Sequence, residues 1–131
     1  MLDSDVCIDV MRRRSRKARW RLERSKPGEV AISSIVAAEL WTGVAKSREP
    51  ERAAHALRDF LAYVTVLDWP AEAAVVYGKI RAGLESEGRV IGAMDKLIAA
   101  HAIHESATLV TRNRDEFERV AGLKLATWER R

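Results

Sequence analysis

The stretch GAMDKLIAAHAIHESATLVTRN, residues 92–113, decides the fold because it joins a helix to a buried strand. Gly92 marks a turn, the apolar residues after it have helical spacing, and TLVT at 108–111 has the composition of a strand. Asp95 stands at the head of this helix. A carboxylate beside an apolar helix costs free energy unless a helix N-terminus, a base or a metal ion offsets its charge. Choosing among these three partners of Asp95 is most of the functional question.

The rest of the chain repeats the alternation of strand and helix. Short strands are predicted at Met1 to Asp3, 29–33, 64–68 and 123–126. An N-terminal arm through about Ser25 is predicted to form one or two helices, and a further helix follows Ser33 or Ser34 as its N-cap. Another helix starts at Pro50, and the next runs from Pro70 to about Glu87, with Gly88 as its C-cap. A last helix is predicted over 115–120. Strands separated by helices pair in parallel, because parallel neighbours need long crossover connections. The sequence therefore predicts an α/β fold in which helices cover both faces of a central, mostly parallel sheet.

Composition indicates a globular chain without linkers. The chain has 131 residues, of which 47% are hydrophobic and 32% are charged, with 7 Gly, 3 Pro and a single Cys. This length fits one domain, residues 1–131, which needs no disulfide to fold. The start, MLDSDV, lacks the cationic and apolar stretches of a secretory signal, and no apolar run approaches the roughly 18 residues that a membrane helix needs. We therefore expect a soluble, cytoplasmic protein that does not enter a membrane.

Positive charge is concentrated near the N-terminus. The net charge is +4, and residues 12–26 hold nine Lys or Arg residues against one acid, Glu23. Such a segment attracts a phosphate backbone or an acidic partner, and its alternative interpretation is a solvated helix surface. Arg12, Arg13 and Arg16 are candidate contacts, although the cations spread around the whole helical wheel. Trp20, set among arginines, is a candidate for stacking on a base.

Acidic and amide side chains recur where parallel strands would end. Asp3 ends the first predicted strand, Glu39 lies about two helical turns after the second, Asp95 heads its helix, and Asn113 follows TLVT. In open parallel sheets the crevice lies beyond the carboxyl ends of the strands, so all four side chains can face it. Two carboxylates about 4 Å apart repel by roughly 4 kcal/mol at an effective dielectric constant near 20, so a cluster of three needs a cation. Oxygen ligands favour Mg²⁺ or Mn²⁺, and such an ion suits hydrolysis of a phosphodiester.

Three segments also carry a family resemblance. MLDSDVCIDVM, ISSIVAAELWTGVAKS and LESEGRVIGAMDKLIAAHAIHESATLVTRNRDEFERVAGLKLATW together resemble the PIN-domain ribonucleases of the VapC toxin family, over nearly the whole chain. The resemblance implies a PIN-like α/β/α sandwich and an Mg²⁺- or Mn²⁺-dependent endoribonuclease. It also implies the toxin of a toxin–antitoxin pair, with a VapB-type antitoxin as partner, a homodimer, and RNA, frequently transfer RNA, as substrate.

The resemblance assigns roles residue by residue. Asp3 matches the first acidic residue of the family, Glu39 the glutamate of its AEL motif, and Asp95 the aspartate that opens its D-x-L-I-A-A helix. These three residues would form the catalytic, metal-binding set. Many PIN domains carry a fourth acid where this chain has Asn113, whose carbonyl oxygen can still bind an ion.

Several neighbouring residues are auxiliary candidates. Asp115 either substitutes for the fourth acid or caps the following helix, and Asp5, where the family usually has Asn, either tightens the metal site or caps the first helix. Ser4 either bonds a ligand carboxylate or water, or makes a local turn. Thr111 borders the crevice as a possible partner of a ligand or water. Arg112 either meets phosphate or is an ordinary surface cation.

Two further patterns have structural interpretations. His101 and His104 form H-x-x-H, which can bind a metal, but His101 is expected to pack beneath the sheet and His104 to lie near an exposed helix end. In the resembled family the N-terminal helical arm helps to hold the antitoxin. Trp20 and Leu22 are therefore expected to line the antitoxin groove together with their basic neighbours.

Two other classes of function compete with the nuclease. A non-catalytic RNA-binding module would use residues 12–26, and its binding would depend steeply on salt but not on EDTA. A phospho-acceptor domain would use Asp68, after the strand at 64–68, near Asp3 and Asp5. The two helices that precede that strand argue against the phospho-acceptor.

Overall fold

The N-terminal segment, residues 1–3, lies between two pairs of parallel strands in the computed structural model, which describes residues 1–128. Strand β1 (Ala31–Ser33) pairs with β2 (Thr65–Leu67), and β3 (Thr108–Val110) pairs with β4 (Lys124–Ala126). The predicted parallel pairing is confirmed, because both pairs run in parallel across helical crossovers.

Backbone hydrogen bonds join the two pairs through the N-terminus. The Leu2 N–H donates to the Ala31 carbonyl (3.0 Å), the Val110 N–H donates to the Met1 carbonyl (2.8 Å), and the Asp3 N–H donates to the Val110 carbonyl (3.1 Å). The lateral order is therefore β2, β1, residues 1–3, β3, β4. The chain adds β1 and then β2 on one side of residues 1–3, and afterwards β3 and then β4 on the other side. Residues 1–3 and β3 thus flank the switch point at which open α/β sheets bind ligands.

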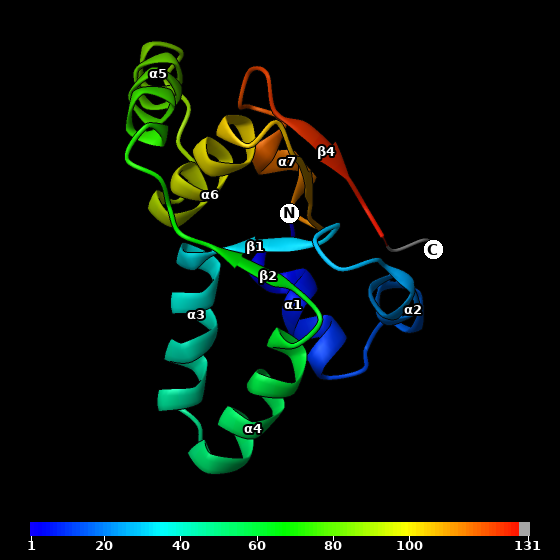
Figure 1. The fold of residues 1–131 in the computed structure, drawn as a ribbon. Helices are drawn as coiled ribbons and strands as arrows, with labels where there is room; N and C mark the ends of the chain where they lie inside the picture. The colour runs from blue at the N-terminus through cyan, green and yellow to red at the C-terminus, as the bar shows by residue number, and fades with distance from the viewer. Residues whose placement is uncertain (129–131) are drawn as a thin grey trace.

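Helices cover both faces of these strands (Figure 1). Their bounds are α1 (Ser4–Met11), α2 (Arg16–Arg24), α3 (Ser34–Ala45), α4 (Pro50–Leu61), α5 (Ala73–Ser86), α6 (Ala93–His104) and α7 (Arg114–Phe117). Figure 1 shows α1, α3 and α4 on one side of β1 and β2, and α5 and α6 on the other. This α/β sandwich is the architecture predicted from the sequence. Within residues 1–128, no helix combines the length and apolar character that crossing a bilayer requires.

The core lies along the strands and under α6. Leu2, Ile32 and Leu109 are fully buried in neighbouring positions of the sheet layer. Helix α6 buries Ala99 and Ala102, whose small side chains let it lie close to the strands, since tight packing of helices favours short side chains there. The first three residues of the chain are thus enclosed on all sides.

The observed boundaries refine the predicted ones. The N-terminal arm divides into α1 and α2, which the sequence left open. The helix expected from Pro70 starts at Ala73. Ahead of it, the Trp69 backbone N–H donates to the Ser34 hydroxyl (3.0 Å) and the Trp69 indole Nε1–H donates to the Leu97 carbonyl (2.9 Å), which fixes this segment to α3 and α6.

Ser33 provides a test of how β1, α3 and α6 are held together. Its buried hydroxyl oxygen accepts the Ile35 N–H (3.1 Å) as the N-cap of α3 and lies 2.8 Å from the Nδ1 of buried His101. Ser33→Ala should lower the free energy of unfolding by about 2–4 kcal/mol, because it removes a cap and leaves a buried imidazole unpaired. Urea unfolding followed by circular dichroism measures this loss.

The control is Ser47→Ala, which removes a hydroxyl that accepts the Glu49 N–H (3.1 Å) at the surface. We expect this control to change the free energy of unfolding by no more than about 0.5 kcal/mol. Equal losses in the two variants would contradict the role given to Ser33.

Candidate functional site

Asp3 is the most enclosed carboxylate at the carboxyl edge of the strands. It is only 5% exposed and is the N-cap of α1, where its Oδ1 accepts the Val6 N–H (3.1 Å). Its Oδ2 accepts a hydrogen bond from the buried Thr111 hydroxyl. Burial raises the pKa of Asp3, while the bonds from Thr111 and Val6 act in the opposite direction. The carboxylate is therefore held in one orientation at a cost in desolvation.

Glu39 reaches the same place from α3. Its side chain is half-buried, and its Oε1 accepts a hydrogen bond from the Ser4 hydroxyl (2.5 Å). Because Ser4 directly follows Asp3, this bond brings Glu39 to the end of the N-terminal segment. Of the two alternatives for Ser4, the structure has the bond to a neighbouring carboxylate and not a local turn.

Asp95 lies in the first turn of α6 and is paired with a residue that the sequence analysis did not select, Glu116. Burial raises the pKa of Asp95 to about 7, with further contributions from the charge and hydrogen bond of Glu116 and from the charges of Glu39 and Asp3. The pKa of Glu116 is instead lowered, first by the hydrogen bond from the Gly92 N–H (2.6 Å). Below about pH 7 the pair therefore holds one proton, carried mainly by Asp95, and this proton is lost as the pH rises through that value.

Glu116 takes the place that was considered for Asp115. Asn113 is the N-cap of α7, and its Nδ2 donates to Glu116 Oε2 (2.6 Å) across the first turn. Asp115 is exposed beside Gly88 and Glu118, on another side of that turn. Asp115 also makes no cap, because the N-cap position belongs to Asn113. The sequence signal for Glu116 was its position three residues after Asn113, the spacing of a capping box.

A chain of hydrogen bonds connects the carboxylates. The Thr111 hydroxyl donates to Asp3 and accepts the Asn113 N–H (2.9 Å), and Asn113 in turn donates to Glu116. Asn113 thus offers its amide nitrogen to a carboxylate, which leaves its carbonyl oxygen free of this bond. Thr111, Asn113 and Gly92 orient acids that come from segments far apart in the sequence.

The chemistry of this site fits a hard divalent cation. Asp3, Glu39, Asp95 and Glu116 supply only carboxylate oxygens, which Mg²⁺ and Mn²⁺ prefer. As the side chains stand, no three of the Asp, Glu, His or Cys residues within 1–128 are grouped closely enough to enclose an ion. Their repulsion is instead reduced by hydrogen bonds and by the proton on Asp95, whose place a cation can take.

The remaining candidates lie around this centre. Asp5 is exposed in the first turn of α1, and its charge raises the pKa of Asp3. The capping alternative for Asp5 is wrong, because Asp3 is the cap. Arg112 is ion-paired through its Nε to Oδ2 of buried Asp9 (2.9 Å). His101 is buried against Ser33, as expected, and His104 is exposed.

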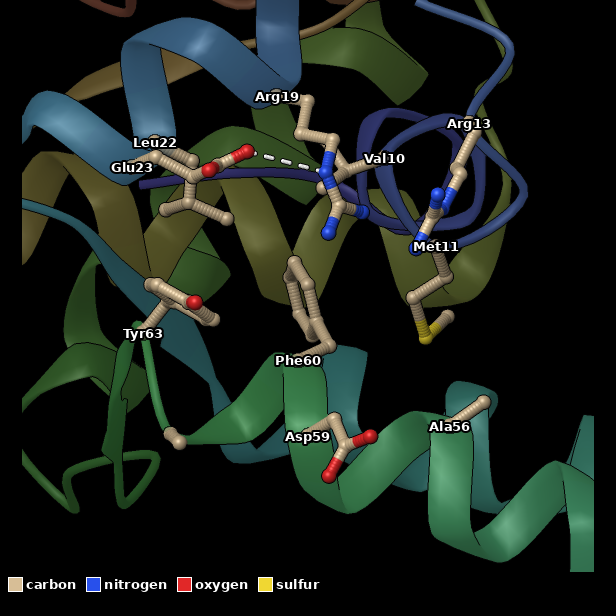
Figure 2. Close-up of a pocket in the computed structure, with 11 residues that line it drawn as sticks. Val10, Met11, Arg13, Arg19, Leu22, Glu23, Ala56, Asp59, Phe60 and Tyr63 are labelled. Atoms are coloured by element: carbon tan, nitrogen blue, oxygen red, sulfur yellow. Dashed lines mark ion pairs between the residues drawn. The ribbon is translucent and has the colours of Figure 1, made fainter.

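A groove of about 570 Å³ lies between α1, α2 and α4, and none of the four site carboxylates lines it. Figure 2 shows the Phe60 ring rising from α4 toward α1 and α2, with Leu22 and the ion pair of Arg19 and Glu23 on the opposite side of the groove. The other lining residues are Met11, Arg13, Ala56, Asp59, Ala62 and Tyr63.

The residues that the sequence suggests as contacts of RNA or antitoxin lie on different surfaces. Arg13 and Leu22 line this groove, whereas Arg12, Arg16 and Trp20 do not. Trp20 is 59% exposed and shares a second, shallower hollow with Arg16, and the Arg24 guanidinium lies 4.7 Å from its ring centre.

Comparison with known proteins places the chain in a family. A family model described as the PIN domain matches residues 1–123. The chain belongs to the PIN-domain family. Ribonuclease VapC2 of Rickettsia felis is 41% identical over 131 residues, which cover 99% of this chain and 98% of that protein. The tRNA(fMet)-specific endonuclease VapC of Shigella flexneri is 39% identical, over 98% of this chain and 96% of that protein. The resemblance to VapC ribonucleases is thus confirmed.

Solved structures agree with this assignment. The PIN domain described here matches the crystal structure of VapBC2 from Rickettsia felis bound to a promoter DNA fragment, with a TM-score of 0.92 and 39% identity over 98% of both chains. It matches DNA-bound VapBC from Salmonella typhimurium with a TM-score of 0.93 and 36% identity, over 98% of this chain and 97% of the other. The PIN fold predicted from the sequence is confirmed.

The proton on Asp95 predicts how the stability of the metal-free protein depends on pH. Because folding raises the pKa of Asp95 from 3.8 to about 7, its contribution is most favourable below the unfolded value and is lost as pH rises through 7. Asp95→Asn removes this loss. In EDTA the variant should therefore melt at a higher temperature than the parent at about pH 8, by a margin that shrinks toward pH 5.

The matched control is Asp115→Asn, whose exposed side chain is outside the hydrogen-bonded network. Thermal melts at both pH values compare the two variants. The interpretation of Asp95 fails if its advantage over the parent is the same at both, or if Asp115→Asn shows the same trend.

Proposed function

We propose that this chain is the toxin of a VapB–VapC-type toxin–antitoxin pair and hydrolyses phosphodiester bonds of RNA with a bound Mg²⁺ or Mn²⁺. The observation that supports this most strongly is that four carboxylates lie near enough to the switch point of a PIN-domain sheet for the charges of three of them to act on the fourth, Asp95. We also propose that residues 1–131 form a single domain that works in the cytoplasm as a homodimer.

The proposed site divides the work among its side chains. Asp3, Glu39, Asp95 and Glu116 would hold the ion, which when bound polarises the phosphate and lowers the pKa of a water. Thr111 fixes the Asp3 carboxylate through its hydroxyl group. Asn113 and the Gly92 N–H fix Glu116.

The proposed substrate is RNA, with transfer RNA as the first candidate. The Shigella flexneri relative is named a tRNA(fMet)-specific endonuclease, and its alignment extends over nearly all of this chain. That relation makes tRNA(fMet) the natural RNA with which to begin an assay.

The proposed partner is a VapB-type antitoxin that binds in the groove between α1, α2 and α4. The similar structures from Rickettsia felis and Salmonella typhimurium are VapBC complexes. The groove offers an apolar floor at Phe60 and Leu22 with charged residues at its edge, which suits an amphipathic segment of a partner.

A non-catalytic RNA-binding module accounts for less of the structure. Several cations of residues 12–26 are engaged within the chain: Arg19 pairs with Glu23, Arg21 lies over the Trp128 ring, and Arg24 lies over the Trp20 ring. Such a module would also not need the clustered acids. Separate titrations of EDTA and salt distinguish the two functions, because only hydrolysis responds to EDTA.

The pairing of Asp95 with Glu116 predicts a sharp difference between two adjacent residues. Glu116→Gln should reduce Mg²⁺- or Mn²⁺-supported cleavage of tRNA(fMet) by about 100-fold, and Asp95→Asn should abolish it, because each removes a ligand charge. Asp115→Asn should stay within about twofold of the parent because its carboxylate is outside the network.

Initial rates on gel-resolved RNA, with circular dichroism to check folding, measure these effects. Full activity in the folded Asp95→Asn variant would overturn the nuclease site. Equal effects of Glu116→Gln and Asp115→Asn would remove Glu116 from it.

The groove predicts a variant that separates antitoxin binding from cleavage. Tyr63 is exposed at the groove, so Tyr63→Ala should weaken the complex with the VapB-type antitoxin by about tenfold or more while the free toxin still cuts RNA. Tyr77→Ala on α5, outside the groove, is the control. Isothermal titration calorimetry gives both affinities. A Tyr63→Ala complex as tight as that of Tyr77→Ala would place the antitoxin elsewhere.

A further inference from the structure

Arg112 is a cation held at the edge of the acidic site by a buried carboxylate. It directly follows Thr111, whose hydroxyl donates to Asp3, and its charge is close enough to lower the pKa of Asp3. Its Nε lies 2.9 Å from Oδ2 of Asp9 in α1. The two residues are far apart in sequence, so their contact depends on the completed fold.

The two partners of this ion pair differ sharply in exposure. The Asp9 side chain is 6% exposed, whereas 46% of the Arg112 side chain is open to solvent. A buried carboxylate is costly to leave unpaired, so Asp9 restrains the guanidinium more firmly than a surface acid would. A guanidinium has five N–H donors in a planar fork, and one carboxylate engages at most two of them side by side. Arg112 therefore has donors to offer a second anion from a fixed position.

A cation is needed at this place if RNA enters the site. The site gathers the carboxylates of Asp3, Glu39, Asp95 and Glu116, which repel the phosphates that flank the scissile bond. A divalent ion offsets only two of the four negative charges, so a net repulsion remains at the phosphates on either side of the reacting one. Arginine binds phosphate oxygens through two parallel N–H bonds, which also fixes the register of the strand.

We infer that Arg112 binds a backbone phosphate of the RNA strand as it enters the acidic site, and that Asp9 is the positioning residue that holds Arg112 there. This inference rests on the proposed ribonuclease function and adds a residue that fixes the register of the RNA strand in the site. The four carboxylates would act on one phosphodiester, and Arg112 would fix a neighbouring one.

The competing explanation is that the ion pair only fastens α1 to the end of β3. A fastening role predicts lost stability in Arg112 variants, with unchanged RNA affinity per folded molecule. Phosphate binding predicts weaker RNA affinity and a smaller dependence of that affinity on salt, because one fewer counterion is released per phosphate contact. Stability alone cannot produce the change in salt dependence.

The chain contains a matched control two residues away. Arg114 is 45% exposed, against 46% for Arg112, and also forms an ion pair through its Nε, with Glu118 (3.5 Å) along the exposed side of α7. Arg114→Gln therefore removes the same charge from a comparable environment. It should leave RNA affinity and its salt dependence close to those of the parent.

The first experiment measures binding of a fluorescein-labelled single-stranded RNA 12-mer of mixed sequence, in EDTA, by anisotropy over a series of salt concentrations. Relative to the parent and Arg114→Gln, Arg112→Gln should bind about tenfold more weakly at low salt, as expected for a lost charge-assisted bond. Its slope of log affinity against log salt should be shallower by about 0.7. Arg112→Lys should recover the slope but not the full affinity, because lysine keeps the charge and loses the fork.

Asp9 is tested through a double variant. Asp9→Asn should weaken binding, but Asp9→Asn with Arg112→Gln should bind no more weakly than Arg112→Gln alone, because Asp9 acts through Arg112. A slope for Arg112→Gln equal to that of Arg114→Gln overturns the inference, and so does an additive loss in the double variant.

The second experiment separates this inference from the proposed function. In cleavage of tRNA(fMet) with Mg²⁺ or Mn²⁺, Arg112→Gln should raise KM by about tenfold and leave kcat within about threefold of the parent. If the parent itself does not cut RNA, the proposed function fails, whatever the binding slopes are. If the parent cuts and Arg112→Gln has an unchanged KM, only the role of Arg112 fails.

Discussion

The hydrogen bond from the Thr111 hydroxyl to the Asp3 carboxylate is the interaction on which the rest of the structure depends. It joins the residue that ends the N-terminal segment to the residue that follows β3, at the centre of the strand order. The same Asp3 carboxylate accepts the Val6 N–H and so starts α1. One side chain thus closes the sheet layer, begins a helix and supplies a charge to the site. The desolvation that raises the pKa of Asp3 is the cost of using one group for all three purposes.

Local sequence patterns were sufficient to predict much of this arrangement. The alternation of strands and helices predicted parallel pairing, and the rule for the carboxyl edge predicted that Asp3, Glu39 and Asp95 would approach one another. Glu116 was missed because α7 has only four residues, so its starting residue decides which side chain faces the site. A helix turns by about 100° per residue, and an error of one residue exchanges Asp115 for Glu116. The pair of Asp9 and Arg112 had no local signal, since only the folded chain brings α1 beside the end of β3.

The basic segment shows how composition can overstate free charge. Residues 12–26 dominate the net charge, yet Arg21 and Arg24 lie over indole rings and Arg19 pairs with Glu23. These contacts stabilise α2 and its packing, which reduces the number of cations free to meet a ligand. A single cation at the edge of the acidic site has more influence on an incoming phosphate than several remote ones, because exposed charges are screened beyond about 8 Å at physiological salt.

The acidic site also limits the repulsion among its own carboxylates. Without a cation, the four carboxylates are tolerated because Ser4, Thr111 and Asn113 donate hydrogen bonds and because Asp95 keeps its proton up to about pH 7. The proton sits on Asp95 because Glu116 is the better stabilised anion, held by the Gly92 N–H and by Asn113. Asp95 is therefore the carboxylate that is least favourable to ionise, and it changes between its neutral and charged forms near neutral pH. A divalent ion that displaces this proton would bring two positive charges in place of one. The site is therefore disposed to take up metal at the pH at which Asp95 loses its proton and the repulsion among the carboxylates rises.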